Sequence, residues 1–458
     1  MFKFLTALFT LTILFHGTSD ARTHSLRLEI LKEAVAVQYF ATLPFRESPF
    51  ADLTGIHHIT ADEAKTRNHF RFEYDAQWRP IRVVFMLADI PRSPNQTANF
   101  FFRTSRIDIH YTPGRETRKF YDRFGNAAKA RGIYREIYET GQNGYRTRLT
   151  FENPDGSAAQ SSWGVAEYRW KILRDGTVVE DHYDLEGKVV VKRPNLTFYQ
   201  LRLHYGPNGW LGLMENFGPE GKKLVNNTMN GAQDKLEYDA NGDMRAWNVY
   251  DENEMRVKGN SPGVHRGLRD YDAHGYIIRS YYEDEDYVRM KSAYGWGETH
   301  TVYDRQGNMI ERWTGTETGE PAINEKLNYS GYFLSWDKSG RNQISREFFN
   351  EDKKTPAIHA RTGAHKVNFF YNRAGNKIRE EYRAPNGQLV RNRALGAAIV
   401  TYKYDSDHRL IEKHLFDEGQ NPITGNEGWA GEKYDYNEYG FVSPIRQYDE
   451  SLSPIARD

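Results

Sequence analysis

An aromatic–Asp turn motif returns along this chain roughly every 33 residues, a period within the range of known repeat proteins. It is first seen at Tyr121-Asp122, and copies begin at Tyr238, Tyr271, Tyr303, Trp336, Tyr371, Tyr404 and Tyr436. Ile172 and Tyr205 open degenerate copies, and from Ile172 onward the step between successive copies is nearly constant. A fixed period of this size is the signature of a repeat protein, in which each unit stacks on its neighbours.

The motif has the chemistry of a chain reversal. Its Asp side chain can accept hydrogen bonds from the backbone amides that follow, which fixes the start of a turn. Its Gly can take the left-handed backbone conformation that a Cβ would penalise. The residues that we expect to form these structural turns include Asp122, Gly125, Asp239, Gly242, Asp304, Gly307 and Gly375.

Each unit has room for short strands between three turns. A second aromatic recurs in the middle of the unit, as at Tyr382, and a glycine marks a third turn later on. Before the turn at Asp405, the residues Val400, Tyr402 and Tyr404 fall on one face of an extended chain. That period-two pattern is typical of half-buried antiparallel strands. The sequence therefore predicts an all-β repeat array of stacked antiparallel β-hairpins, which form an extended or curved, solenoid-like sheet.

The Tyr-Asp-x-x-Gly anchors between about Arg115 and Asp449 resemble those of the bacterial YD-repeat (RHS-type) families. The resemblance rests on the short turn motif and its recurrence. It implies an exported repeat protein whose hairpins stack into one continuous sheet.

Four regions are expected along the chain. Residues 1–21 have the positive start, apolar stretch and small-residue cleavage site of a signal peptide. Residues 22–114 form an N-terminal capping region, 115–450 the tandem YD-type hairpin repeats, and 451–458 a C-terminal tail. The predicted location is therefore secreted or periplasmic, with no transmembrane segment after signal cleavage.

The N-terminal region is expected to be a small α+β cap. Apolar residues between Leu26 and Ala41 suggest a helix, and Thr60 with Glu63 forms a capping-box pattern. Alternation around Tyr74-Asp75 then predicts a hairpin that resembles a founder repeat.

Motifs with catalytic chemistry are weak in this sequence. Residues Gly259 to Gly263 match G-x-S-x-G, but Pro262 follows the serine and the segment falls where a third turn is expected. The acidic run Glu283 to Asp286 could take a hard cation or simply be a solvated turn. The chain has no cysteine, and its only adjacent histidine pair, His57-His58, lacks the spacing of a zinc site. We therefore predict no catalytic residue, no metal and no cofactor.

The charge balance and the aromatic content limit the classes of partner that this chain can bind. Lys plus Arg and Asp plus Glu are 62 each, so no global charge attracts nucleic acid. The leading hypothesis is a non-enzymatic binding or scaffold protein of the bacterial envelope or exterior, which presents a repeated β-surface to a protein partner. The alternative is a carbohydrate- or cell-wall-binding protein, and an enzyme acting on an envelope polymer is a third. An aromatic platform for sugars would use Trp296, Trp313, Trp429 and Tyr282.

Overall fold

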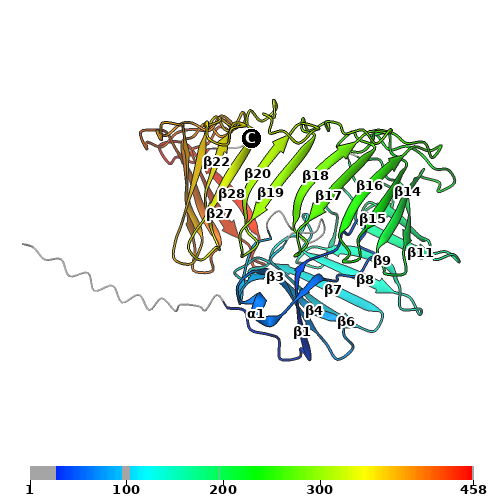
Figure 1. The fold of residues 1–458 in the computed structure, drawn as a ribbon. Helices are drawn as coiled ribbons and strands as arrows, with labels where there is room; N and C mark the ends of the chain where they lie inside the picture. The colour runs from blue at the N-terminus through cyan, green and yellow to red at the C-terminus, as the bar shows by residue number, and fades with distance from the viewer. Residues whose placement is uncertain (1–26, 95–103, 195, 456–458) are drawn as a thin grey trace, which may run out of the picture.

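The computed structural model describes residues 27–94, 104–194 and 196–455. The predicted signal peptide, residues 1–21, and the last three residues of the predicted tail lie outside this part. Within it the chain forms 28 strands of one open sheet and a single short helix (Figure 1). No helix there is long and apolar enough to cross a membrane.

The elements follow one another as an antiparallel meander. The first elements are β1 (Ala36–Thr42), β2 (Ile56–Ile59), α1 (Ala61–Ala64), β3 (Asn68–Tyr74), β4 (Pro80–Leu87), β5 (Ile90–Pro91), β6 (Arg106–Thr112), β7 (Arg115–Tyr121), β8 (Arg135–Thr140), β9 (Arg146–Glu152), β10 (Ala158–Ala159), β11 (Glu167–Ile172) and β12 (Val178–Tyr183). The later strands are β13 (Gln200–Tyr205), β14 (Leu211–Phe217), β15 (Gln233–Tyr238), β16 (Met244–Tyr250), β17 (Arg266–Tyr271), β18 (Ile277–Glu283), β19 (Glu298–Tyr303), β20 (Met309–Gly315), β21 (Gly331–Trp336), β22 (Gln343–Phe349), β23 (Lys366–Tyr371), β24 (Lys377–Arg383), β25 (Ile399–Tyr404), β26 (Leu410–Phe416), β27 (Gly431–Tyr436) and β28 (Val442–Tyr448). This confirms the predicted all-β array of stacked hairpins.

The first turn of each unit has the predicted chemistry. In the turn between β19 and β20, the Asp304 carboxylate accepts hydrogen bonds from the amides of Gln306 and Asn308, at 2.9 Å each. Gly307 has φ +79°, the left-handed conformation that favours glycine. The strand register shifts directly after the turn, so the second residue of β20, Ile310, has no partner across the ladder. The same register shift, a β-bulge, follows the first turns of the units from Tyr205 onward.

The aromatic residue that opens the motif joins one unit to the one before it. The Tyr404 hydroxyl donates to the Lys377 carbonyl at 2.9 Å, and the Trp336 indole donates to the Met309 carbonyl at 2.8 Å. The same bond is made by Tyr271, Tyr303, Tyr371 and Tyr436. In each case the acceptor is the first residue of the second strand in the preceding unit. The anchor aromatic thus satisfies a backbone carbonyl at the rim of its neighbour.

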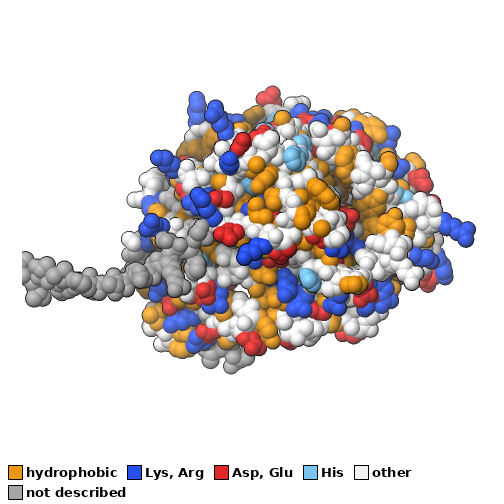
Figure 2. Space-filling model, turned by 90° about the horizontal axis from the view of Figure 1, so that it is seen from below, with side chains coloured by type: hydrophobic (Ala, Val, Ile, Leu, Met, Phe, Trp, Pro, Cys, Tyr) orange, Lys and Arg blue, Asp and Glu red, His pale blue; other side chains and the backbone are white. Residues whose placement is uncertain are grey.

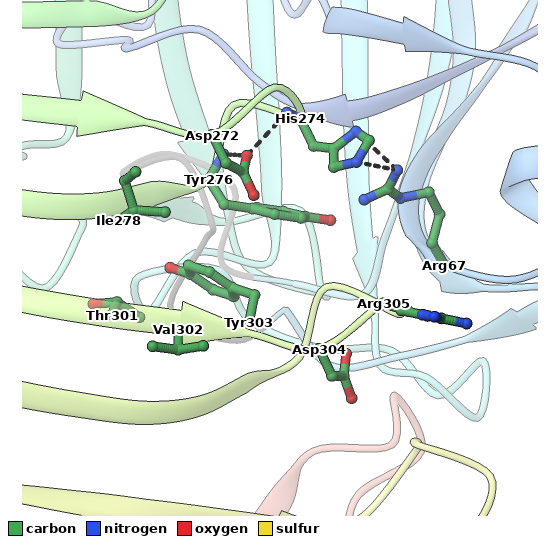
Figure 3. A pocket seen from close by; sticks show the side chains of 10 residues that line it. All are labelled: Arg67, Asp272, His274, Tyr276, Ile278, Thr301, Val302, Tyr303, Asp304 and Arg305. Carbon is green, nitrogen blue, oxygen red and sulfur yellow. Dashed lines mark hydrogen bonds between the residues drawn. The ribbon is translucent and has the colours of Figure 1, made fainter.

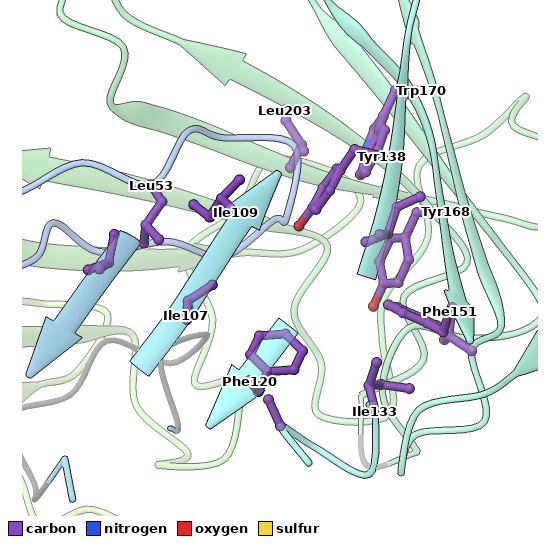
Figure 4. Close-up of a cluster of buried hydrophobic side chains, with 14 of the residues drawn as sticks. Leu53, Ile107, Ile109, Phe120, Ile133, Tyr138, Phe151, Tyr168, Trp170 and Leu203 are labelled. Atoms are coloured by element: carbon purple, nitrogen blue, oxygen red, sulfur yellow. The ribbon is translucent and has the colours of Figure 1, made fainter. Parts of the chain in front are cut away.

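The largest apolar core lies where the N-terminal strands meet the first units of the array. It contains the buried residues Phe70 and Phe85. Tyr138, Trp170 and Leu203 are buried in the same core (Figure 4). The rings of Tyr138 and Trp170 are stacked with their centroids 6.3 Å apart. We call the sheet face that carries the Leu203 side chain the inner face and the opposite one the outer face. The cross-strand pairs between successive units show which residues of the later strands lie on each face.

The N-terminal region lies along the first turns of the later units, below the row of array strands in Figure 1. Going along the N-terminal region, each successive residue contacts a turn that lies further along the array. The contacts of this region are His57–Asp243 (2.7 Å), Arg67–His274 (2.8 Å), Asn68–Gln306 (2.7 Å) and Arg92–Arg341 (3.1 Å). The turn at Asp122, the first copy of the motif, continues the series with Arg123–Gly375 and Asn126–Asp407 (2.8 Å). The region therefore forms a floor against which the curved array rests.

One expectation for this region is wrong and one is confirmed. The helix expected between Leu26 and Ala41 is absent from the described residues 27–41: the chain is irregular before Ala36 and then enters β1, which pairs with β3 through residues such as Tyr39. The helix α1 begins at Thr60, whose side chain and that of Glu63 form the predicted capping box. The boundary expected at residue 115 falls in the turn of the β6–β7 hairpin, and the sheet continues through it without a break.

Candidate functional site

The aromatic side chains expected to form a sugar platform lie mainly inside the sheet. Trp313, Trp429 and Tyr282 are 3%, 2% and 7% exposed, and Trp296 is partly buried. Trp429 belongs to the core between the last units. These positions therefore present no common exposed face.

Trp313 has a packing role on the outer face. A Cβ added at Gly331 would lie 2.1 Å from Cε3 of Trp313, so the indole covers the bare backbone of the adjacent strand. The same relation holds on the inner face between Trp247 and Gly267, where the distance would be 1.9 Å. Both glycines serve close approach of a ring to a strand backbone.

The motifs weighed for catalysis lie on turns. The G-x-S-x-G segment closes a turn in which the Gly263 amide donates to the Asn260 carbonyl at 3.0 Å. In the acidic run, the Asp284 carboxylate accepts from the amides of Asp286 and Val288 at 3.0 and 2.9 Å. In the part of the chain that the structure describes, no group of three or more His, Asp or Glu side chains is arranged to hold a metal ion.

A buried polar cluster surrounds Glu180. Its carboxylate accepts from the Trp170 indole at 2.9 Å and from Ser48, and it lies 2.9 Å from both His182 Nε2 and Lys192 Nζ. Burial alone would raise the pKa of Glu180, but Lys192 and the hydrogen bonds from His182 and Ser48 lower it. Because the side chains of Glu180, His182 and Lys192 are 0% exposed, the cluster anchors the loop at Ser48 and cannot meet a substrate.

A stripe of isoleucines runs across five successive units. It occupies the bulge position, the second residue of the strand after each first turn. Its members, here called the isoleucine stripe, are Ile278, Ile310, Ile344, Ile378 and Ile411. Ile278, Ile344 and Ile378 are 37%, 40% and 38% exposed. The two preceding units have Gly212 and Arg245 at this position, so the bulge itself does not require isoleucine.

A pocket of about 470 Å³ adjoins the first end of the isoleucine stripe (Figure 3). Ile278 and Val302 line it beside the rings of Tyr276 and Tyr303, which stack with centroids 4.9 Å apart. Arg67 of the floor reaches it next to His274 (Figure 3). The pocket thus combines an apolar wall with charged groups at its edge.

A larger groove of about 1170 Å³ opens among the turns of five early hairpins. We call it the rim groove, and residues of the 44–54 loop line its base. Its lining includes Trp78 and Tyr145, which are 63% and 55% exposed. Seen from below, apolar side chains of the molecule form patches separated by charged ones (Figure 2).

Neither the stripe nor the groove was predicted. The isoleucines recur once in each of five units of the sequence, but only the strand register shows that they share the bulge position. The groove is assembled by turns that lie far apart in the sequence, and no local pattern marks it.

Neither a family model nor a curated protein matches this chain. Among solved structures, it is similar to TcdB2-TccC3-TEV, with 14% identity and a TM-score of 0.33, over 86% of this chain and 20% of that one. It is also similar to TcdB2-TccC3 without its hypervariable C-terminal region, with 15% identity and a TM-score of 0.32, over 85% and 22%. The chain spans about a fifth of the length of these structures.

Proposed function

We propose that this chain is an exported, non-enzymatic scaffold that binds a protein partner along the isoleucine stripe. The observation that carries the proposal is the stripe itself. Five consecutive units place a β-branched apolar side chain at a position that contributes nothing to strand pairing. Bulges re-aim side chains, and three of the five, Ile278, Ile344 and Ile378, are exposed.

The surroundings of the stripe suit a protein interface. Equivalent positions are two strands apart, which gives a step of about 10 Å and a stripe of roughly 40 Å. Val302, 43% exposed, lines the pocket beside Ile278. Ion pairs border the stripe, such as Lys353–Glu311 at 2.6 Å and Lys366–Glu347 at 2.8 Å. An apolar strip with a polar rim is the usual anatomy of a binding surface, and the pocket beside Ile278 could take an anchoring side chain.

The proposal includes no catalytic residue, because the polar cluster that was weighed for one is buried. The polar cluster around Glu180 is closed to solvent. The export part of the proposal rests on the signal-peptide pattern of residues 1–21. Sequencing the N-terminus of the chain recovered outside producing cells tests it, and the expected first residue is Arg22.

The binding part is tested by affinity capture from the exterior fraction of the source cells. The bait chains are the wild type, the double variant Ile344→Arg/Ile378→Arg, and the control Leu185→Arg/Val288→Arg. The control positions are 50% and 59% exposed and lie on other turns. We expect one partner to be retained by the wild type and the control and reduced at least tenfold by the stripe variant. Equal recovery with all three baits contradicts the proposal.

A further inference from the structure

We infer that the rim groove is a binding site for an acidic polysaccharide chain, one built of sugar rings that carry carboxylates. This inference is separate from the proposed protein-binding stripe and rests on other residues. It begins with Trp78, whose conformation and exposure the fold does not explain.

Trp78 stands where nearly every other first turn has glycine. In its turn the Trp78 amide donates to the Asp75 carbonyl at 2.9 Å, as the Gly125 amide does to Asp122 at 3.2 Å. Trp78 has φ +59°, a conformation unfavourable for a bulky residue. His408 is a similar exception, with φ +65°, but its ring stacks on Phe124 at 4.5 Å.

Trp78 has no comparable burial to compensate for its backbone. Its side chain is 63% exposed and is tilted against the Tyr74 ring, with centroids 5.8 Å apart. A tryptophan that accepts backbone strain to expose its indole in a groove points to a ligand that stacks on it. Tyr145, 55% exposed on another of the five turns, supplies a second ring.

The charge of the groove selects the class of sugar. Its lining includes five arginines, Arg46, Arg79, Arg115, Arg118 and Arg146, against the acids Glu47, Asp52 and Glu116. Arg46, Arg118 and Arg146 are buried, and Arg79 also pairs with Asp75 at 2.6 Å. Arg79 and Arg115 have side chains 45% and 50% exposed, so they can meet a ligand. Arg115 lies 3.6 Å from Glu152, a distance that leaves its guanidinium able to bind another carboxylate.

Stacking rings and guanidinium groups in one open groove match a polymer that alternates apolar sugar faces with carboxylates. Neutral glycans would use the rings alone, and an acidic peptide would use the arginines alone. The volume of about 1170 Å³ accommodates several sugar units.

The test is calorimetric titration of the purified chain with polygalacturonate oligomers, with neutral dextran oligomers of similar length and with poly-glutamate peptide. The variants are Trp78→Gly, which suits the positive φ, and Arg115→Gln. Tyr287→Gly is the matched control, because Tyr287 also has a positive φ (64°) and is 42% exposed but lies outside the groove.

We expect saturable binding of polygalacturonate that weakens at least tenfold in Trp78→Gly and in Arg115→Gln and is unchanged in Tyr287→Gly. Dextran and poly-glutamate should bind at least tenfold more weakly than polygalacturonate. The inference is overturned if polygalacturonate does not bind, if Trp78→Gly binds it within twofold of the wild type, or if dextran or poly-glutamate binds equally well.

Discussion

The ring of Tyr134, which lies just before β8, packs edge-on against Phe441 of the last hairpin, with centroids 5.2 Å apart. Residues from opposite ends of the repeat region thus meet, because the array curves back to the region where it began. Lys129 adds a second contact, with Nζ 5.2 Å from the Phe441 ring.

This contact should protect the end of the array. We expect Phe441→Ala to speed amide hydrogen exchange in β27 and β28, because the free edge of β28 then has less to hold it. Exchange in β19 to β22 should not change. Uniformly faster exchange over all strands would show that the contact has no local role.

The anchor aromatics should each stabilise one junction between units. Tyr371→Phe removes the bond to the Gln343 carbonyl (3.0 Å) while keeping the ring. We expect the free energy of unfolding to fall by about 0.5–1.5 kcal/mol in chemical denaturation, the usual range for one hydrogen bond. A matched control is Tyr439→Phe, since Tyr439 is 40% exposed on a turn. If Tyr371→Phe leaves the free energy of unfolding unchanged, this hydrogen bond does not stabilise the junction between units.

Gly331 is required by the ring that covers it. Gly331→Ala should destabilise the chain by about 1–3 kcal/mol, since the new Cβ would overlap Trp313. Trp313→Ala should relieve most of this cost and leave the part due to the Arg312 carbonyl oxygen, 2.7 Å from the new Cβ, which a double-mutant cycle would detect. The control Gly212→Ala should cost little, because the nearest atom to a Cβ there is 3.8 Å away. Additive effects of the two substitutions would contradict the packing argument.

Much of this architecture could be predicted from the sequence, and the reasons are local. Asp304 and Gly307 determine their turn within a short segment, and the period then repeats it. The segment from Leu26 to Ala41 was misassigned because its apolar residues satisfy a helical pattern as well as a strand. Only pairing with β3 decides between them.

The functional surfaces depend on relations that no window of sequence contains. Ile378 is exposed because the ladder skips it between Lys377 and Arg379. Trp78 faces a groove because four other turns, from residues far apart in sequence, surround it. Trp313 and Trp429 looked available for stacking, but neighbouring strands bury them.

Asp234 should make stability fall as the pH rises. Burial raises its pKa to about 7 from 3.8, against the opposing hydrogen bond from Asn260 at 2.6 Å. Between these values the folded chain keeps a proton that the unfolded chain has released, so the stabilising proton is lost as the pH rises through about 7.

Asp234→Asn removes this titration. We expect the variant to exceed the wild type in free energy of unfolding at pH 8.5, by about 1–4 kcal/mol, and to differ little at pH 4. Denaturant titrations at the two pH values measure this. A difference that is the same at both would mean that Asp234 does not titrate in this range.

The pairing of His57 with Asp243 should stabilise the fold more at low pH than at high pH. The hydrogen bond that His57 donates to Asp243 raises the pKa of His57, so their pairing stabilises the fold fully below about pH 6.5 and less as the pH rises through the higher folded value. His57→Asn keeps a residue that tolerates φ +55° but cannot reach Asp243. We expect its loss of stability to be larger at pH 5.5 than at pH 9, and an equal loss at both would exclude a charged pair.

The central claim, that the isoleucine stripe binds a protein, is tested most directly by placing a photo-crosslinking amino acid on it. The crosslinker replaces Ile344 in one version of the chain and Val288, which is exposed on a turn away from the stripe, in another. After irradiation with the captured partner, the account predicts a covalent adduct from position 344 and none from position 288. An adduct from position 288 alone would contradict the claim.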